Sequence, residues 1–379
     1  MKMILKNCHI VSPAYELENA AVEIEDGIIR RVYASGETLP AGNHYDAKGL
    51  TAIPGFIDMH FHGSLGFDIS DGEASGVEKI AECKLKEGVT SMVPATLTLA
   101  EETLAKSLSA IASYAKNPKF CKVPGVHLEG PYVNPAWKGA QNPAFIRNPD
   151  INEVLRLNKI MRVLLVTFAI ESEGGLEFVG QLRANGIVPS CGHSGATHAQ
   201  FVEAHRRGLS NLTHFCNQMS PLHHREIGLV GSGLSDDGTM IEMICDKLHL
   251  SPPMVALAFK VKPLDKIALI TDSLAASWLP DGPSSIGGLP VVVKNGEARL
   301  ASNGALAGSC LKFNIALKNA AEISGLPLKD VVRTSSLNQA QALGLDNLGR
   351  IAPGYAADLV LLDKEFSVKQ VFVDGVAKI

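Results

Sequence analysis

The sequence predicts an α/β protein: a (β/α)8 TIM-like barrel with a small β-sandwich domain formed by both termini. The first observation is a series of short apolar runs, separated by stretches of helical composition. This alternation is typical of a parallel sheet covered by helices, and eight such units are typical of a closed barrel. The second observation is that both ends of the chain lack the alternation and resemble hairpins. The third is that side chains able to bind metals follow several of the apolar runs.

Eight apolar runs supply the predicted barrel strands. The first begins at Ala52 and ends at Met59, just before His60. The others span, in chain order, residues 89–95, 123–128, 163–170, 187–191, 209–212, 240–245 and 267–270. Stretches between them, such as 76–86 and 100–115, have helical composition. In such a barrel the carboxyl ends of all strands meet at one face, which carries the catalytic residues.

The two ends of the chain do not show the alternation of apolar runs and helical stretches seen in the middle. Short apolar-rich strands are predicted over residues 3–11 and 20–24, and Asp26-Gly27 is typical of a hairpin turn. Residues 357–376 show the same pattern of short apolar strands and a turn. Because isolated hairpins are only marginally stable, one unit built from both ends is favoured over two independent flaps. We expect the β-sandwich to comprise 1–52 and 347–379, and the barrel to comprise 53–346 with a β-hairpin insertion near 286–301.

Length, composition and charge exclude several classes of protein. The 379 residues exceed the usual size of a single core, so a barrel plus a smaller unit fits. A formal net charge of −4 offers no basic surface for nucleic acid. No apolar run approaches the roughly 18 residues of a membrane span, and no signal peptide is evident. The seven Cys lack CxxC spacing and lie mostly in apolar runs, so we expect reduced thiols and a cytoplasmic location.

Side chains suited to metal binding or proton transfer follow five of the predicted strands. His60 and His62 are two positions apart, so on a strand both point to the same side. The full set is His60, His62, Glu129, His193, His214 and Asp272. Each has a structural alternative, such as a buried histidine, a salt bridge at the barrel rim, or a helix N-cap for Asp272. Six of them at one face favour a metal site, with ligands that suit zinc, iron(II), manganese or cobalt(II) better than calcium or magnesium.

This set indicates hydrolysis of an amide. A divalent metal polarises a carbonyl group and lowers the pKa of bound water. Such a site also needs an acid/base that takes the proton of the water and passes it to the leaving amine. Asp272, at the end of the last strand, is the candidate for this role.

Several segments resemble a known family. Residues 54–63, PGFIDMHFHG, look like the opening motif of the amidohydrolase superfamily. Five further segments resemble, in the same order, N-acetylglucosamine-6-phosphate deacetylases: HLEGP at 127–131, GHS at 192–194, THFCNQM at 213–219, TD at 271–272 and LAGS at 306–309. The tail 349–360 is similar to the closing segment of that family. The resemblance spans nearly the whole chain, and HLEGP and THFCNQM are its most specific parts.

The resemblance implies a role for each matching residue. Glu129, His193 and His214 match the principal metal ligands, and His60 and His62 match a pair that completes a second metal site. One or two divalent ions per subunit are therefore expected, zinc first, with iron, manganese or cobalt as alternatives. Asp272 matches the catalytic acid/base. The positions that match substrate contacts are Ala140, Gln141, Asn217, Gln218, Arg225, Asp246, His249, Leu306, Ala307 and Gly308.

The implied activity is metal-dependent removal of the acetyl group from N-acetylglucosamine 6-phosphate. The partner is then a small phosphorylated amino sugar, and a homodimer is expected in which Arg225 or His249 can act across the interface. Many relatives have His where this chain has Gln141, which can donate a hydrogen bond but cannot carry charge.

Three alternatives stay open. One is the N-acetylgalactosamine 6-phosphate epimer as substrate, and another is an amidohydrolase acting on an N-acyl or cyclic amide. Cyclic amidases usually bridge their metals with a modified Lys, and no Lys ends the third or fourth run. The last alternative is a non-catalytic barrel that has lost its metals.

Overall fold

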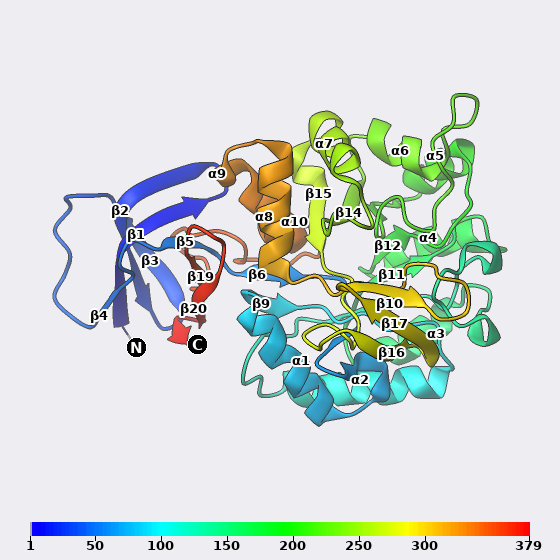
Figure 1. Cartoon of the computed structure of the whole chain (residues 1–379), viewed down its shortest axis with the longest axis horizontal. Helices are drawn as coiled ribbons and strands as arrows, with labels where there is room; N and C mark the ends of the chain where they lie inside the picture. The colour runs from blue at the N-terminus through cyan, green and yellow to red at the C-terminus, as the bar shows by residue number, and fades with distance from the viewer. Residues whose placement is uncertain (1) are drawn as a thin grey trace.

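The computed structural model describes residues 2–379 and contains strands in all eight predicted barrel positions (Figure 1). They are β6 (Phe56–Asp58), β9 (Val89–Met92), β10 (Val126–Glu129), β11 (Val163–Phe168), β12 (Val188–Cys191), β13 (Asn211–Leu212), β14 (Met240–Ile244) and β15 (Ile267–Ile270). Every residue of these strands is buried, as expected for a parallel sheet covered on both faces.

The eight strands form a curled, barrel-like parallel sheet. Strands β10 to β15 pair in chain order, and β6 pairs with β9. Backbone hydrogen bonds complete the ring beyond the strand ends. Thr96 N donates to His127 O at 2.9 Å, and Asp272 N donates to His60 O at 2.9 Å. The predicted α/β barrel fold is confirmed.

Helices surround the sheet because each carries an apolar stripe. In α2 (Glu101–Ala115), Leu104, Leu108 and Ile111 are fully buried at helical spacing. The other helices are α1 (Ala74–Lys86), α3 (Ile151–Asn158), α4 (Gly175–Ala184), α5 (His198–Arg206), α6 (Gly228–Ser235), α7 (Pro252–Val261), α8 (Phe313–Ser324), α9 (Leu328–Val331) and α10 (Leu337–Ala342). Within residues 2–379, none of the helices has the length and apolar character needed to cross a membrane.

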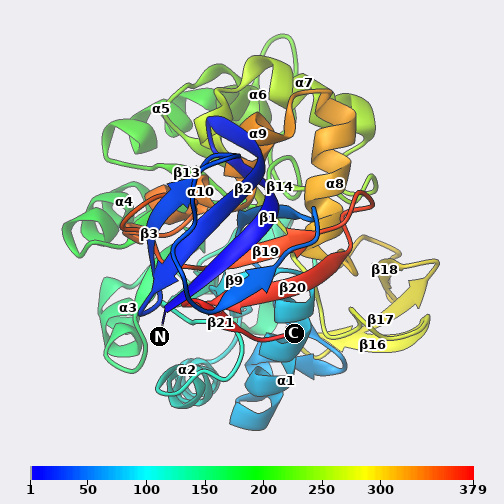
Figure 2. The ribbon, with the colours of Figure 1, turned by 90° about the vertical axis from the view of Figure 1, so that its left-hand side faces the viewer.

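Both chain ends contribute to one eight-stranded mixed sheet, which faces the viewer in Figure 2. Its order is β21-β20-β19-β5-β1-β2-β3, and β4 pairs with β1. The strands are β1 (Lys2–Ser12), β2 (Tyr15–Glu25), β3 (Ile28–Tyr33), β4 (His44–Asp46), β5 (Thr51–Pro54), β19 (Leu359–Leu362), β20 (Val368–Val373) and β21 (Val376–Ala377). The sheet has its own apolar core, which includes Leu5, Ile10, Val22 and Phe372. The expectation that both termini build one β unit is confirmed.

An insertion of three antiparallel strands follows the last barrel strand. It comprises β16 (Gly282–Ile286), β17 (Leu289–Lys294) and β18 (Glu297–Leu300). Asn295 and Gly296 make the expected turn, with φ of 53° and 73°. The sequence predicts a hairpin starting at Ile286, but Gly287-Gly288 form a second turn with φ of 54° and 80°, so an additional strand precedes it. A further pair of short strands, β7 (Gly63–Ser64) and β8 (Phe67–Asp68), follows β6.

A buried Lys links α1 to the strands that lead to the carboxyl face. Lys84 Nζ donates to Asp58 Oδ2 at 3.0 Å, to Glu87 Oε2 at 3.3 Å and to Thr271 Oγ1 at 2.9 Å. Asp58 Oδ1 accepts hydrogen bonds from the backbone N of His60 and of Thr271. Buried charges are tolerated when they are paired and hydrogen-bonded, as here. The cluster fixes the ends of β6 and β15 relative to each other.

Candidate active site and metal centre

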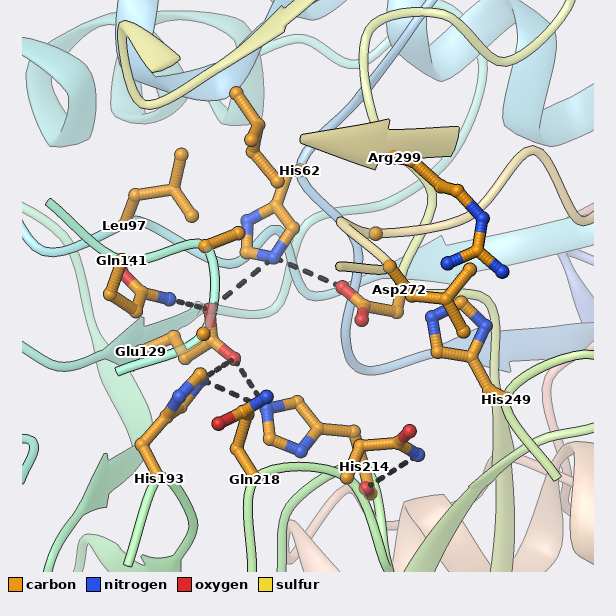
Figure 3. A pocket seen from close by; sticks show the side chains of 16 residues that line it. His62, Leu97, Glu129, Gln141, His193, His214, Gln218, His249, Asp272 and Arg299 are labelled. Atoms are coloured by element: carbon orange, nitrogen blue, oxygen red, sulfur yellow. Dashed lines mark hydrogen bonds and ion pairs between the residues drawn. The ribbon is translucent and has the colours of Figure 1, made fainter. Parts of the chain in front are cut away.

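A cavity of about 350 Å³ opens at the carboxyl ends of the barrel strands (Figure 3). The predicted site residues that line it are His62, Glu129, Ala140, Gln141, His193, His214, Asn217, Gln218, His249, Asp272, Leu306 and Gly308. His60 lies beneath them and is completely buried. The fold therefore brings together side chains that are more than 200 residues apart in the sequence.

Glu129 stands among four imidazoles. Its Oε1 lies 3.3 Å from His60 Nε2, 3.4 Å from His193 Nε2 and 3.0 Å from His214 Nε2, and its Oε2 lies 3.4 Å from His62 Nε2. These residues form two groups of three that could each hold a metal ion, with all ligand atoms of a group within 4.8 Å of one another. Glu129 belongs to both groups, so it is the side chain through which two ions would be joined.

The orientation of the imidazoles fits a metal. His62 Nδ1 donates to Ala95 O at 3.1 Å, and His193 Nδ1 donates to Trp137 O at 3.0 Å. A carbonyl oxygen can only accept, so both rings carry a proton on Nδ1, and in the neutral form of each ring the Nε2 lone pair faces Glu129. His60 Nε2 is buried without a hydrogen-bond partner. A divalent cation would satisfy these nitrogen lone pairs, and histidine and carboxylate ligands suit zinc and similar metals.

The three site residues that follow strands β12, β13 and β15 have a left-handed backbone. The φ values are 49° for His193, 32° for His214 and 50° for Asp272. Residues other than Gly rarely adopt this region, and such positions cluster at functional sites. Each of these residues comes just after a barrel strand, and the sharp turn directs its side chain into the cavity rather than along the sheet.

The carboxylates of the site are ionised at neutral pH. Burial raises the pKa of Glu129, but the charge of His60 and hydrogen bonds from His193 and His214 outweigh it and hold the pKa well below its ordinary value. Burial also raises the pKa of Asp272, but the hydrogen bond from His62 and the charges of His60 and His62 lower it to about 2. Asp272 Oδ1 lies 3.1 Å from His62 Nε2. Asp272 is therefore a proton acceptor beside the metal-binding groups.

Asp272 does not cap a helix, so that alternative interpretation is wrong. The residues after it form turns and the β16–β18 insertion, and the next helix, α8, begins only at Phe313. Asp272 is instead held by its backbone, whose N donates to His60 O and whose O accepts from Ser309 N at 2.8 Å. The carboxyl group is left facing the cavity.

Gln141 is fixed between the loop after β9 and the metal-binding groups. Its Oε1 accepts from Thr98 N at 2.7 Å, and its Nε2 donates to Glu129 Oε2 at 2.6 Å. The side chain is only 3% exposed. The amide therefore makes its hydrogen bonds to protein groups and orients Glu129 without adding charge to the site.

Some of the predicted substrate contacts line the cavity, and others lie behind the lining residues. Asp246 Oδ2 accepts from His249 Nδ1 at 2.6 Å, so Asp246 orients the His249 ring without lining the cavity itself. Burial lowers the pKa of His249, but the hydrogen bond and charge of Asp246 raise it above its ordinary value. Ala307 is buried behind the lining residues Leu306 and Gly308.

Arg225 lies outside the cavity of its own chain. It is exposed on the loop before α6, where its guanidinium contacts the ring of His224 at 2.7 Å. Within residues 2–379, the Arg that lines the cavity is Arg299 of β18, which is not among the predicted site residues. Nothing in its sequence context marked Arg299, because its position over the cavity depends on how the insertion folds back.

Glu242 is a second residue of the site that is not among the predicted site residues. It is fully buried in β14, and its Oε2 accepts from His60 Nδ1 at 2.9 Å while its Oε1 accepts from Asn211 Nδ2 at 2.7 Å. A single carboxylate in the apolar run MIEMIC was a usable signal, because charged residues are almost never fully buried without a partner. A carboxylate behind a ligating His fixes the ring and raises its basicity.

Replacing Glu242 with Gln should weaken metal binding by about 10- to 100-fold. The amide removes the charge and has only one acceptor oxygen, so it cannot accept from both His60 Nδ1 and Asn211 Nδ2, and the His60 ring is held less firmly. Equilibrium dialysis should show the weaker binding, and metal at saturating concentration should restore most of the acetate release. Glu153→Gln is the control, because Glu153 is a buried carboxylate paired with Arg147, away from the imidazoles. Unchanged metal affinity in Glu242→Gln would contradict this role.

Comparisons with known proteins agree with this geometry. The amidohydrolase family model matches residues 51–378. The chain is 38% identical to an N-acetylglucosamine-6-phosphate deacetylase of known structure from Thermotoga maritima, with a TM-score of 0.90 over 100% of this chain and 99% of that one. A mutant of the Mycobacterium smegmatis enzyme, solved in complex with N-acetyl-D-glucosamine-6-phosphate, is 30% identical with a TM-score of 0.94 over 100% and 99% of the two chains. An N-acetylgalactosamine-6-phosphate deacetylase from Escherichia coli is 34% identical over 99% of both chains.

These similarities cover the barrel, the terminal sheet and the cavity alike. Identity of 30% or more over the full length of both chains exceeds what a shared fold alone implies. The chain therefore belongs to the amidohydrolase family and, within it, to the N-acetylglucosamine-6-phosphate deacetylase family.

Proposed function

We propose that this chain hydrolyses the N-acetyl group of N-acetylglucosamine 6-phosphate, producing the amino sugar phosphate and acetate. The observation that carries the proposal is the pairing of Asp272 with the buried His and Glu cluster at the floor of one cavity. An ionised carboxylate beside two potential metal positions is the arrangement that amide hydrolysis needs. The names of the related deacetylases support the same reaction.

In this proposal Glu129, His193 and His214 would hold one divalent ion, and His60 and His62 would hold a second ion together with Glu129. Zinc is the first candidate, followed by iron(II), manganese and cobalt(II). When bound, such a metal polarises the acetyl carbonyl and lowers the pKa of a water molecule.

The protein's own contribution is the movement of one proton. Asp272 accepts the proton of the attacking water as the new C–O bond forms, and returns it to the sugar nitrogen as the C–N bond breaks. His62, 3.1 Å from Asp272 Oδ1, keeps the carboxyl group directed at the reacting atoms. Gln141 holds Glu129 in place through its 2.6 Å hydrogen bond.

The sugar would occupy the outer part of the cavity. We assign the sugar contacts to Ala140, Gln141, Asn217, Gln218, Leu306, Ala307 and Gly308, and the phosphate contacts to His249, oriented by Asp246, and Arg225. Because Arg225 lies outside the cavity of its own chain, this assignment requires Arg225 to act from the second subunit of a homodimer. We further propose that the enzyme works in the cytoplasm, where its phosphorylated substrate would be retained.

The galacto epimer is the second candidate substrate, because the Escherichia coli relative is named for it. The two are separated by measuring acetate release from both epimers, each with and without the 6-phosphate. We expect the gluco phosphate to have the highest kcat/KM, and removal of its phosphate to cost roughly 10- to 100-fold, as for charge-assisted hydrogen bonds. A higher kcat/KM for N-acetylgalactosamine 6-phosphate would make it, rather than N-acetylglucosamine 6-phosphate, the proposed substrate. No acetate from any of the four would reject both.

A further inference from the structure

The outer end of the cavity has one permanent positive charge supplied by its own chain. Within the described residues 2–379, Arg299 is the one Arg or Lys among the side chains that line the cavity. Figure 3 shows it on the same side of the cavity as His249 and Asp272, away from His193. A dianionic group bound at this end would therefore meet Arg299 and His249 together.

Arg299 is held in place without using all of its donors. Its Nη1 donates to Gly304 O at 2.6 Å, and its Nη2 forms an ion pair with Glu297. A guanidinium has five N–H donors in a rigid fork, so three remain for a ligand. The side chain is 47% exposed, as a group at the cavity mouth should be if it receives a ligand from solvent.

The backbone joins Arg299 to the reacting end of the cavity. Strand β18 pairs with the segment after it: Arg299 is bridged to Leu306, and Ala307 N donates to Ala298 O at 3.1 Å. The same segment continues to Ser309, whose N donates to Asp272 O at 2.8 Å. A group bound to Arg299 is therefore held at a set distance from the Asp272 carboxyl group.

We propose that Arg299 binds the 6-phosphate of the substrate within its own chain, together with His249. The inference rests on the proposed function, because it assumes that a phosphorylated sugar occupies this cavity. Arg matches two phosphate oxygens with its planar fork, and His249 adds a second donor. The insertion β16–β18 then determines specificity for phosphorylated sugars, in addition to covering the cavity. The alternative role for Arg299 is structural: its pair with Glu297 would only stabilise the insertion.

The test compares Arg299→Met with Lys294→Met on N-acetylglucosamine with and without the 6-phosphate. Lys294 is an exposed cation on β17 of the same insertion that does not line the cavity, so it controls for loss of charge. Arg299→Met should lower kcat/KM for the phosphorylated sugar by roughly 10- to 100-fold. Arg299→Met should change the rate on the unphosphorylated sugar less than twofold. Lys294→Met should change kcat/KM for the phosphorylated sugar, and the rate on the unphosphorylated sugar, by less than twofold.

Two further variants separate binding from folding. Arg299→Lys should recover part of the loss, because it keeps the charge without the fork. Glu297→Gln breaks the ion pair but keeps Arg299, so it should leave kcat/KM for the phosphorylated sugar near the wild-type value. Equal losses on both substrates in Arg299→Met, or a loss in Glu297→Gln as large as in Arg299→Met, would assign Arg299 a structural role and overturn the inference.

Binding of glucose 6-phosphate, measured by calorimetry, separates this inference from the proposed function. Glucose 6-phosphate has no acetyl group, so its affinity reports phosphate recognition even if no acetate is released from any substrate. Wild-type protein should bind it roughly 10- to 100-fold more tightly than Arg299→Met does. Equal affinity of the two proteins would overturn the inference, whether or not the deacetylase activity is found.

Discussion

Replacing Asp272 with Asn should lower kcat by about 10³- to 10⁴-fold. Asn has nearly the same shape, but its amide cannot accept a proton at neutral pH and return it to the leaving nitrogen. Asp272 acts in both halves of the proposed reaction, so the loss should reach the upper end of what a general acid–base residue contributes. Its pKa, lowered to about 2, means that the wild-type carboxylate is in the base form throughout the neutral range.

The same variant should keep its fold and most of its metal. Asp272 adds a carboxyl group beside His62, but the two groups of potential ligands that share Glu129 do not include it. Thermal unfolding and metal analysis of Asp272→Asn should therefore match the wild type. Asp150→Asn is the control, because Asp150 does cap a helix, with its side chain accepting from Asn152 N at the start of α3. Near-normal turnover in Asp272→Asn would show that Asp272 is not the acid/base.

The second large effect is expected for Glu129→Gln. Each of the four imidazoles lies within 3.4 Å of a Glu129 oxygen, so this one carboxylate serves both potential metal positions. A neutral amide presents one oxygen instead of two and carries no charge to offset two cations. We expect at least about 100-fold weaker metal binding, because changes even behind a ligand weaken metal binding 10- to 100-fold. Acetate release should fall in parallel.

Metal content and rate should be measured on the same samples of Glu129→Gln, over a series of added zinc concentrations. The control is Glu153→Gln, which removes a buried carboxylate far from the imidazoles. Full metal occupancy in Glu129→Gln at the wild-type affinity would show that Glu129 is not the shared ligand.

The sequence was informative where periodicity and spacing decide the structure. Buried parallel strands are continuous apolar runs, so the eight barrel strands could be found before their partners were known. A residue that follows such a run must lie at the carboxyl face, which is why His193, His214 and Asp272 could be placed at one site. The i, i+2 spacing of His60 and His62 likewise predicted that both rings point to the same side, and both lie within 3.4 Å of a Glu129 oxygen.

Other features depend on contacts between distant segments, which one sequence does not encode locally. Arg299 reaches the cavity only because β18 pairs with the segment around Leu306. Arg225 matches a substrate-contact position of the family, yet it is exposed on the loop before α6 and does not line the cavity of its own chain. Glu242 was hidden inside an apolar strand, where its role depends on His60, 182 positions earlier.

The central claim is that a metal held by this His and Glu cluster is needed to remove the acetyl group. The most direct test treats purified protein with a strong chelator, measures its divalent metal content, and follows acetate release from N-acetylglucosamine 6-phosphate before and after metal is returned. Activity should disappear with the metal and recover, at least in part, with zinc, iron(II), manganese or cobalt(II). Full activity in protein without detectable divalent metal would contradict the claim.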